Sequence, residues 1–264
     1  MFLGAFFFCI MFFENLFIYF PQKFPNGDWS APEKNLCSFS VNDVFIDTAD
    51  EETIHGWFYN NPSSDNLLIY FHGNGGNITH RFSWACTLAH LPTNVLIIDY
   101  RGYGKSTGAP DEEGLYRDAE ATLRYAKGQG FSSENITLLG ESLGGGVATY
   151  LASKETFKLL ILQSTFTSIP NMASKVFPFL PGFLISTQMN NLERIKEIDT
   201  PLYLVHSRRD DIVPYHMGEK LYAAAKNPLF FQRFEQYDHN SLSFYEGDTI
   251  IQSIRQEADY LTTD

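Results

Sequence analysis

The sequence predicts an α/β fold built on a mostly parallel, eight-stranded sheet with helices on both faces. Short apolar runs of strand length alternate along the chain with longer helical stretches, which is the pattern of a parallel sheet with crossover helices. The run over residues 94–98 is apolar or β-branched after its first residue, as expected of a strand buried on both faces. With 264 residues and 44% apolar side chains, the chain suits one such domain with a large core.

The individual elements follow from this alternation in chain order. Strands are expected near residues 43–48, 53–59, 67–71, 94–99, 135–139, 158–163, 201–206 and 230–235. Helices are expected near residues 79–90, 113–127, 143–153, 214–226 and 248–262. No internal repeat or low-complexity stretch interrupts the pattern, so residues 25–264 are predicted to form the main domain.

The amino-terminal segment, residues 1–24, stands apart from this pattern. Residues 1–13 are apolar throughout, Glu14 and Asn15 interrupt the run, and residues 16–20 resume it. The uninterrupted part is shorter than the roughly 20 residues of a membrane-spanning helix. It also lacks the basic region and the cleavage site of a secretory signal. We expect the segment to associate with a membrane as an anchor, and the alternative is that it packs on the domain.

A pentapeptide of the form G-x-S-x-G contains the best candidate for a nucleophile. Residues 140–144 read GESLG and lie between an apolar run, residues 136–139, and a stretch of small residues. A serine between a strand and a helix in this way forms a nucleophile elbow, a strained turn that exposes the hydroxyl above a sheet. The glycines allow a close backbone approach that a Cβ would block. Ser142 is therefore the predicted nucleophile.

Such a serine is followed along the chain by an acid and then by a histidine. Asp210 comes just past the predicted strand near 201–206, where an acid at the carboxyl edge of a parallel sheet belongs. His239 lies in a loop after the predicted strand near 230–235. Imidazole accepts the serine proton, and the carboxylate fixes the imidazole tautomer. Ser142, Asp210 and His239 are thus the predicted triad, and two other acids stay open as alternatives: Asp211 and Asp238.

An oxyanion hole would complete the site. The predicted strand at 67–71 runs into the loop HGNGGN, residues 72–77. In an elbow architecture one donor is the backbone N–H after the nucleophile, and the other comes from the loop after the third strand. The predicted donors are the backbone N–H groups of Leu143 and Asn74, with the Asn74 side-chain amide taking no part.

Five segments in this order resemble the α/β-hydrolase superfamily, from about Asp43 to the end of the chain. More closely, they resemble small serine hydrolases that carry HGNxGN, DYRGYGxSxG, GxSxGG, an H-x-x-x-D-x-x-V-P turn and a late HN. In this chain the segments are residues 72–77, 99–108, 140–145, 206–214 and 239–240. The alignment gives Asp210, rather than Asp211, the position of the acid. Ser207 stands where the subgroup usually has glycine, which is a departure in the turn that carries this acid.

The resemblance implies both a cap and a type of reaction. Members of the subgroup include acylglycerol lipases, protein depalmitoylases and esterases. A small cap is expected at about residues 166–197, a stretch rich in proline and aromatic residues, and the alternative is a helical connection that packs in the core. The implied reaction is hydrolysis of carboxylic ester or thioester bonds through an acyl-enzyme, and the resemblance does not select a substrate. Acyl or lipid-like substrates are expected because the aromatic residues of the cap would give the site apolar walls. The alternatives are a peptidase of the same fold and a non-catalytic binding protein.

The composition of the chain limits the kinds of molecule that we expect it to bind. A net charge of −12 without a basic run disfavours nucleic acid. Cys9, Cys37 and Cys86 are scattered and lack the spacing of metal ligands, which predicts reduced thiols in a reducing compartment. No metal and no cofactor is expected. The predicted location is membrane-associated and otherwise cytoplasmic.

Overall fold

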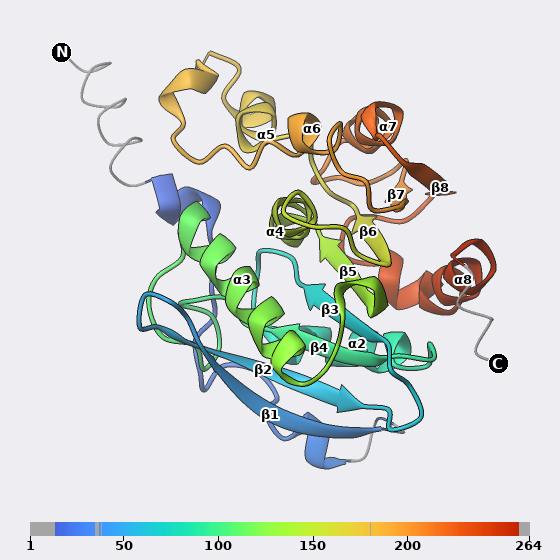
Figure 1. Ribbon diagram of the computed structural model, residues 1–264. Coiled ribbons are helices and arrows are strands. Elements are labelled where there is room, and N and C mark those ends of the chain that lie inside the picture. Colours follow the sequence, from blue (N-terminus) through green and yellow to red (C-terminus); the bar gives the residue numbers. More distant parts are fainter. Residues whose placement is uncertain (1–13, 35–36, 38, 180, 259–264) are drawn as a thin grey trace.

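The computed structural model describes residues 14–34, 37, 39–179 and 181–258 and has one sheet with helices on both faces (Figure 1). The eight strands lie in the order β1-β2-β4-β3-β5-β6-β7-β8. β2 is antiparallel to both β1 and β4, and every pair from β4 onward is parallel. The predicted mostly parallel, eight-stranded sheet is confirmed.

The elements have the following bounds. The strands are β1 (Ser40–Asp47), β2 (Thr53–Asn60), β3 (Leu67–Phe71), β4 (Asn94–Ile98), β5 (Ile136–Glu141), β6 (Leu159–Gln163), β7 (Leu202–Ser207) and β8 (Pro228–Phe234). The helices are α2 (Phe82–Leu88), α3 (Glu112–Gly128), α4 (Leu143–Ala152), α5 (Ile169–Val176), α6 (Asn191–Arg194), α7 (Tyr215–Ala224) and α8 (Leu242–Glu257). The 3₁₀ turns are η1 (Ala31–Lys34), η2 (Ile78–Arg81), η3 (Ser133–Asn135) and η4 (Gly182–Leu184).

The sheet separates two hydrophobic cores. Side chains of successive residues in β3 point to opposite faces, as strand geometry requires. Ile69 and Phe71 belong to the core beneath α3, α4 and α7, whereas Leu68 and Tyr70 belong to the core beneath α2 and α8. Both faces of β3 are therefore covered, which explains its unbroken apolar sequence.

Two helices differ from their predicted bounds. The predicted helix at 79–90 is divided into η2 and α2, and the last helix begins at Leu242 rather than near residue 248. Gly247 lies inside α8, where a Cβ would approach a ring carbon of Trp84 on α2 to 3.0 Å. The glycine thus permits close helix packing here, although glycine is normally a poor helix former. The packing of Gly247 against Trp84 is a tertiary contact, so the local sequence around residue 247 does not predict that the helix continues through this glycine.

The amino-terminal segment packs on the domain from residue 14 onward. Residues 14–18 form a short helix, and Tyr19 is only 3% exposed in the core beneath α3 and α4. The packed domain thus includes residues that the sequence placed before its start at residue 25. Residues 1–13, the apolar part of the expected anchor, lie outside the described residues. Within the described part of the chain, no helix has the length and hydrophobicity needed to cross a bilayer.

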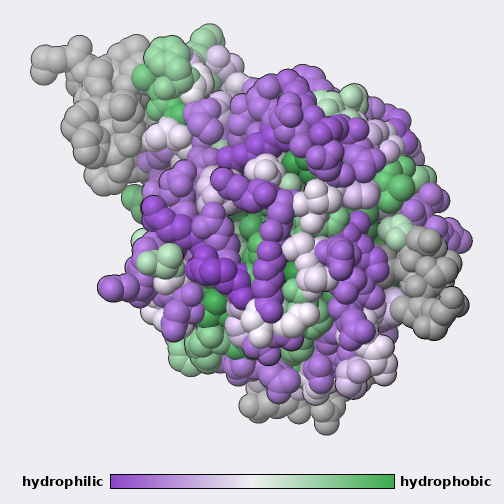
Figure 2. Space-filling view, in the orientation of Figure 1, coloured by the Kyte–Doolittle hydropathy of each residue, from purple (hydrophilic) through white to green (hydrophobic). Residues whose placement is uncertain are grey.

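Residues 166–197, the predicted cap, contain α5, η4 and α6, which lie above α4 in Figure 1. Several of their apolar side chains face solvent: Phe179 is 94% exposed, Phe183 85% and Val176 67%. Figure 2 shows hydrophobic surface at the upper left, over this part of the molecule. These side chains add nothing to the core, so their exposure calls for a functional explanation.

Candidate active site

Ser142 occupies the sharp turn between β5 and α4. Its backbone has φ 51° and ψ −113°, a conformation that non-glycine residues rarely adopt and that is typical of functional sites. A Cβ on Gly144 would lie 1.9 Å from the carbonyl oxygen of Phe71, and one on Gly140 would lie 2.5 Å from that of Gly144. The glycines of the pentapeptide therefore allow α4 to pass close to β3 at Gly144 and close to β5 at Gly140.

The structure brings Ser142, Asp210 and His239 together. Nε2 of His239 lies 3.0 Å from Oγ of Ser142. Nδ1 of the same ring lies 2.8 Å and 3.0 Å from the two carboxylate oxygens of Asp210. The three residues follow β5, β7 and β8, whose carboxyl ends share one edge of the sheet. Strands far apart in sequence thus place a hydroxyl, an imidazole and a carboxylate in one hydrogen-bonded line.

Asp210 is held as a charged carboxylate. Its side chain accepts backbone N–H bonds from Ile212 at 3.0 Å and Val213 at 2.7 Å. Burial by itself raises the pKa of this carboxyl, but hydrogen bonds and charge from His206 and His239 outweigh burial and hold the pKa well below its usual value. A carboxylate that stays ionised orients the His239 ring and stabilises its protonated form.

His206 contacts the acid, a role that was not predicted from the sequence. Its Nε2 lies 3.3 Å from the Asp210 carboxylate and 3.0 Å from the carbonyl oxygen of Val213. The ring is fully buried. The signal in the sequence that could have indicated this contact is the four-residue spacing of His206 and Asp210. His206 lies at the end of β7 and Asp210 in the turn that follows, so the two side chains can meet.

The two alternative acids have other contacts. The Asp211 carboxylate accepts the backbone N–H of His239 at 3.1 Å, so it holds the histidine loop rather than the imidazole. Asp238 accepts the backbone N–H groups at the start of the following turn. Ser207, the departure from the subgroup pattern, is buried, and its hydroxyl accepts the N–H of Tyr237 at 3.1 Å. That bond ties the acid turn to the histidine loop.

The loop at residues 72–77 lies against the nucleophile. A Cβ on Gly73 would come within 3.5 Å of the Cβ of Ser142. Nδ1 of His72 lies 2.7 Å from the Gly73 carbonyl oxygen, and the Tyr100 hydroxyl donates to the carbonyl oxygen of His72 at 2.8 Å. On the other side of the ring, Nε2 of His72 lies 3.4 Å from the buried Asp99 carboxylate. Side chains therefore fix the backbone of this loop next to the serine.

The predicted oxyanion donors lie on this loop and on α4. Leu143 is the first residue of α4, where backbone N–H groups have no partner within the helix. Among the described residues, neither its N–H nor that of Asn74 donates a hydrogen bond. The Asn74 amide is occupied elsewhere, because it bonds the backbone of residues 18 and 20. An N–H at the start of a helix also lies in the positive end of the helix dipole, which favours an anion.

Comparisons with known proteins decide the family. A family model for the alpha/beta hydrolase fold matches residues 66–187. An uncharacterized Mycobacterium tuberculosis protein is 32% identical over 243 residues, which cover 90% of this chain and 85% of that protein. The protein bem46 of Schizosaccharomyces pombe is 33% identical over 246 residues, or 86% and 81% of the two chains. The chain belongs to the α/β-hydrolase fold family.

Solved α/β-hydrolase structures resemble the chain over most of its length. A Pyrococcus furiosus esterase superposes with a TM-score of 0.72 at 25% identity, covering 92% of this chain and 97% of that one. A Butyrivibrio proteoclasticus protein, Est1E, which was solved with ferulic acid bound, gives a TM-score of 0.69 at 20% identity, covering 82% and 99%. The second likeness shows the fold alone. Within the described part of this hydrolase, no group of three His, Cys, Asp or Glu side chains is placed to hold a metal ion.

Proposed function

We propose that the protein is a serine hydrolase that cleaves carboxylic ester or thioester bonds through an acyl-enzyme. The observation that carries the proposal is the bridge made by His239, whose ring lies 3.0 Å from the Ser142 hydroxyl and 2.8 Å from the Asp210 carboxylate. A hydroxyl within hydrogen-bond reach of an oriented base is the arrangement that nucleophilic catalysis requires.

The proposed reaction has two halves. The imidazole of His239 takes the proton of Ser142 while Oγ attacks the acyl carbon, and it then gives that proton to the departing alcohol or thiol as the carbon–oxygen or carbon–sulfur bond breaks. Water next attacks the acyl-enzyme with His239 as the base, and the released Oγ takes the proton back. Free acid leaves, and the serine is restored.

Backbone amides stabilise the negative oxygen of each tetrahedral intermediate. The N–H groups of Leu143 and Asn74 are the proposed donors. Leu143 follows Ser142 directly, Asn74 follows Gly73, which lies against Ser142, and neither N–H has another acceptor within the described residues. Removing one such donor typically lowers kcat by about 10²–10³-fold. Neither donor is a side-chain group, so sequence changes at these positions act through the backbone.

Acyl or lipid-like substrates are the proposed class. The support is the exposed apolar surface of the cap and of the neighbouring amino-terminal helix, where Leu16 is 70% and Phe17 66% exposed. An apolar surface of this kind suits a protein that works at a membrane, with the apolar residues 1–13 as the anchor. The likeness to the Pyrococcus furiosus esterase makes ester hydrolysis the reaction to test first.

Hydrolysis of p-nitrophenyl esters with acyl chains of 2 to about 16 carbons tests both parts of the proposal. We expect hydrolysis by the full chain, with kcat/KM rising as the acyl chain lengthens, and loss of turnover in Ser142→Ala. Ser153→Ala, a change at the exposed end of α4, is the matched control. Activity that survives Ser142→Ala, or no activity on any ester, would contradict the proposal. Hydrolysis of peptide substrates at equal rates would favour a peptidase instead.

A further inference from the structure

The amino-terminal segment lies directly against the candidate oxyanion loop. Residues 20–24 run beside the loops at residues 74–77 and 102–104, with bridges between Pro21 and Gly76 and between Lys23 and Gly104. Phe20 and Gln22 exchange backbone bonds with Gly76 at 3.4 Å and 3.0 Å. The loop is therefore paired along its outer side by a segment that precedes the sheet.

The side chain of Asn74 makes this pairing specific. Its carbonyl oxygen accepts the N–H of Phe20 at 3.0 Å, and its amide nitrogen donates to the carbonyl oxygen of Ile18. The hydroxyl of Tyr103 donates to the side-chain oxygen of Asn74 at 2.9 Å. Because a side chain with three hydrogen bonds fixes its own backbone, these contacts set the direction in which the Asn74 N–H points.

The same segment is tied to the cap at its other end. Glu14 is 8% exposed, and its carboxylate accepts the N–H of Ser186 at 3.0 Å, the N–H of Thr187 at 2.8 Å and the Thr187 hydroxyl at 2.7 Å. Glu112, at the start of α3, accepts the next two backbone N–H groups, those of residues 188 and 189. Two carboxylates thus hold four consecutive amides of the cap, and Figure 1 shows the start of the described chain beside α3.

We propose that residues 14–26 form a strap that positions the oxyanion loop, with the Asn74 amide and Glu14 as positioning residues. The inference rests on the proposed function, since it assigns a purpose to the geometry of one oxyanion donor. Asn77 strengthens the strap by donating from its amide to the carbonyl oxygens of Gln22 and Asn26 at 3.0 Å and 2.8 Å. A strap with this role makes the amino-terminal segment part of the catalytic scaffold as well as the proposed membrane anchor.

The test measures kcat and KM for p-nitrophenyl butyrate in point variants of the full chain. Asn74→Ala keeps the backbone N–H but removes all three side-chain bonds. A displaced donor loses much of its effect on the transition state, so we expect kcat to fall about 10–100-fold while KM changes less than about threefold. Glu14→Ala should lower kcat about fivefold, and Glu14→Gln, which keeps an acceptor oxygen, should recover most of that loss. Asn15→Ala, an exposed neighbour on the same helix, is the control.

A transition-state analogue separates a positioning role from a merely structural one. A trifluoromethyl ketone adds to a serine Oγ and presents an oxyanion, so its inhibition constant should rise in Asn74→Ala by the same factor by which kcat/KM falls. A structural defect that inactivates a fraction of the molecules would lower kcat and leave the inhibition constant unchanged. Should Asn74→Ala not fold, Tyr103→Phe removes only the 2.9 Å bond and should show the same correlation with a loss of about threefold.

The outcomes distinguish the inference from the proposed function. An inactive wild-type chain would overturn the proposed function and this inference with it. An active wild-type chain with unchanged kcat and inhibition constant in Asn74→Ala and Glu14→Ala would overturn the strap alone. Equal losses in Asn15→Ala and Glu14→Ala would likewise contradict it, because the exposed side chain makes none of the strap's contacts.

Discussion

Single residues of the site divide into those that touch the imidazole and those that hold the loops around it. Asp210 bonds the His239 ring through both oxygens, whereas Asp211 bonds only the His239 backbone. The place of Asp210 in a motif favours it as the acid, but Asp211 stays open on sequence alone because neighbouring acids in a turn are not distinguished by a pattern. Only the three-dimensional structure shows that Asp210 contacts the His239 ring and that Asp211 contacts the His239 backbone.

The first prediction follows from that difference. Asp210→Asn should lower kcat by about 10³–10⁴-fold, because an amide cannot stabilise the protonated imidazole and favours the wrong tautomer. The matched variant Asp211→Asn should lose less than about tenfold, since an amide oxygen can still accept the His239 N–H. Steady-state kinetics on a p-nitrophenyl ester measures both. The reverse ranking would assign the acid to Asp211.

The second prediction concerns pH and stability. The pKa of Asp210 is lowered on folding, so the unfolded chain binds its proton more readily than the folded one. The stability that this carboxylate contributes is therefore complete above the unfolded value of about 3.9 and is lost as pH falls through the folded value. The difference in thermal midpoint between wild type and Asp210→Asn should stay constant from about pH 8 to pH 5 and shrink below about pH 4. A difference that already shrinks between pH 7 and 5 would contradict this.

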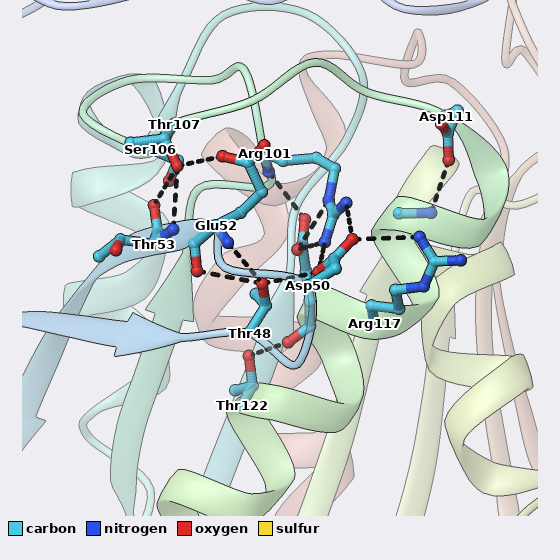
Figure 3. A network of polar contacts seen from close by, with 12 residues as sticks. Thr48, Asp50, Glu52, Thr53, Arg101, Ser106, Thr107, Asp111, Arg117 and Thr122 are labelled. Carbon is cyan, nitrogen blue, oxygen red and sulfur yellow. Dashed lines mark hydrogen bonds and ion pairs between the residues drawn. The ribbon is translucent and has the colours of Figure 1, made fainter.

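At the level of elements, an ion network that is partly buried joins the loop after β4 to α3 and to the turn between β1 and β2. The Arg101 guanidinium lies 2.8 Å from the Asp50 carboxylate and 2.9 Å from that of Asp118, on α3. Figure 3 shows Arg101 beside Asp50, with Arg117 on the other side of Asp50. The Asp118 side chain is fully buried and also accepts the backbone N–H of Arg101. Arg117 reaches the same Asp50 from the surface at 3.1 Å.

The third prediction compares these two arginines. Arg101→Ala leaves the Asp118 carboxylate buried without its partner, which should lower the free energy of unfolding by about 3–5 kcal/mol. Arg117→Ala removes a bond whose arginine is 47% exposed, so its cost should be about 0.2–1 kcal/mol. Urea unfolding followed by circular dichroism measures both. Equal losses would mean that burial does not decide the strength of these pairs.

Elements with strong local patterns were predictable, and those set by tertiary contacts were not. β3 and β4 match their predicted ranges to within a residue because unbroken apolar runs define them. Gly247 lies inside the early-starting α8 and packs against Trp84 on α2, and the hydrogen bonds of Glu14 to residues 186–187 join segments more than 170 positions apart. No local periodicity encodes either contact.

For the whole molecule, the resemblance to hydrolases supplied the topology and the order of the site residues, and the comparisons bear out the family and the fold. The sequence alone did not reveal how the amino-terminal segment joins the rest. From the sequence, the apolar run with its polar interruption was expected to be a membrane anchor, and packing on the domain was the alternative. In the structure, Glu14 at that interruption is buried and bonded to the cap. A buried carboxylate requires hydrogen-bond partners, but which distant residues supply them cannot be predicted from the sequence.

The fourth prediction belongs to this scale and concerns the proposed membrane surface. The full chain should sediment with neutral phosphatidylcholine vesicles, since a net charge of −12 opposes binding to anionic lipid. Replacing Phe179 and Phe183 by serine should weaken partitioning by about fivefold each, because about 1 kcal/mol of apolar burial is lost per ring. Phe45→Ser, a 58% exposed ring on β1, is the control. Unchanged partitioning in the cap variants would remove the cap from the membrane surface.

The central claim is that the hydroxyl of Ser142 is made nucleophilic by His239. Intact-mass measurement and peptide mapping after treatment with a fluorophosphonate test it most directly, because the reagent forms a stable adduct only with an activated serine. We predict a single adduct on Ser142 and a labelling rate at least about 10³-fold lower in His239→Ala. An adduct on any other residue, or His239→Ala labelled at the wild-type rate, would contradict the claim.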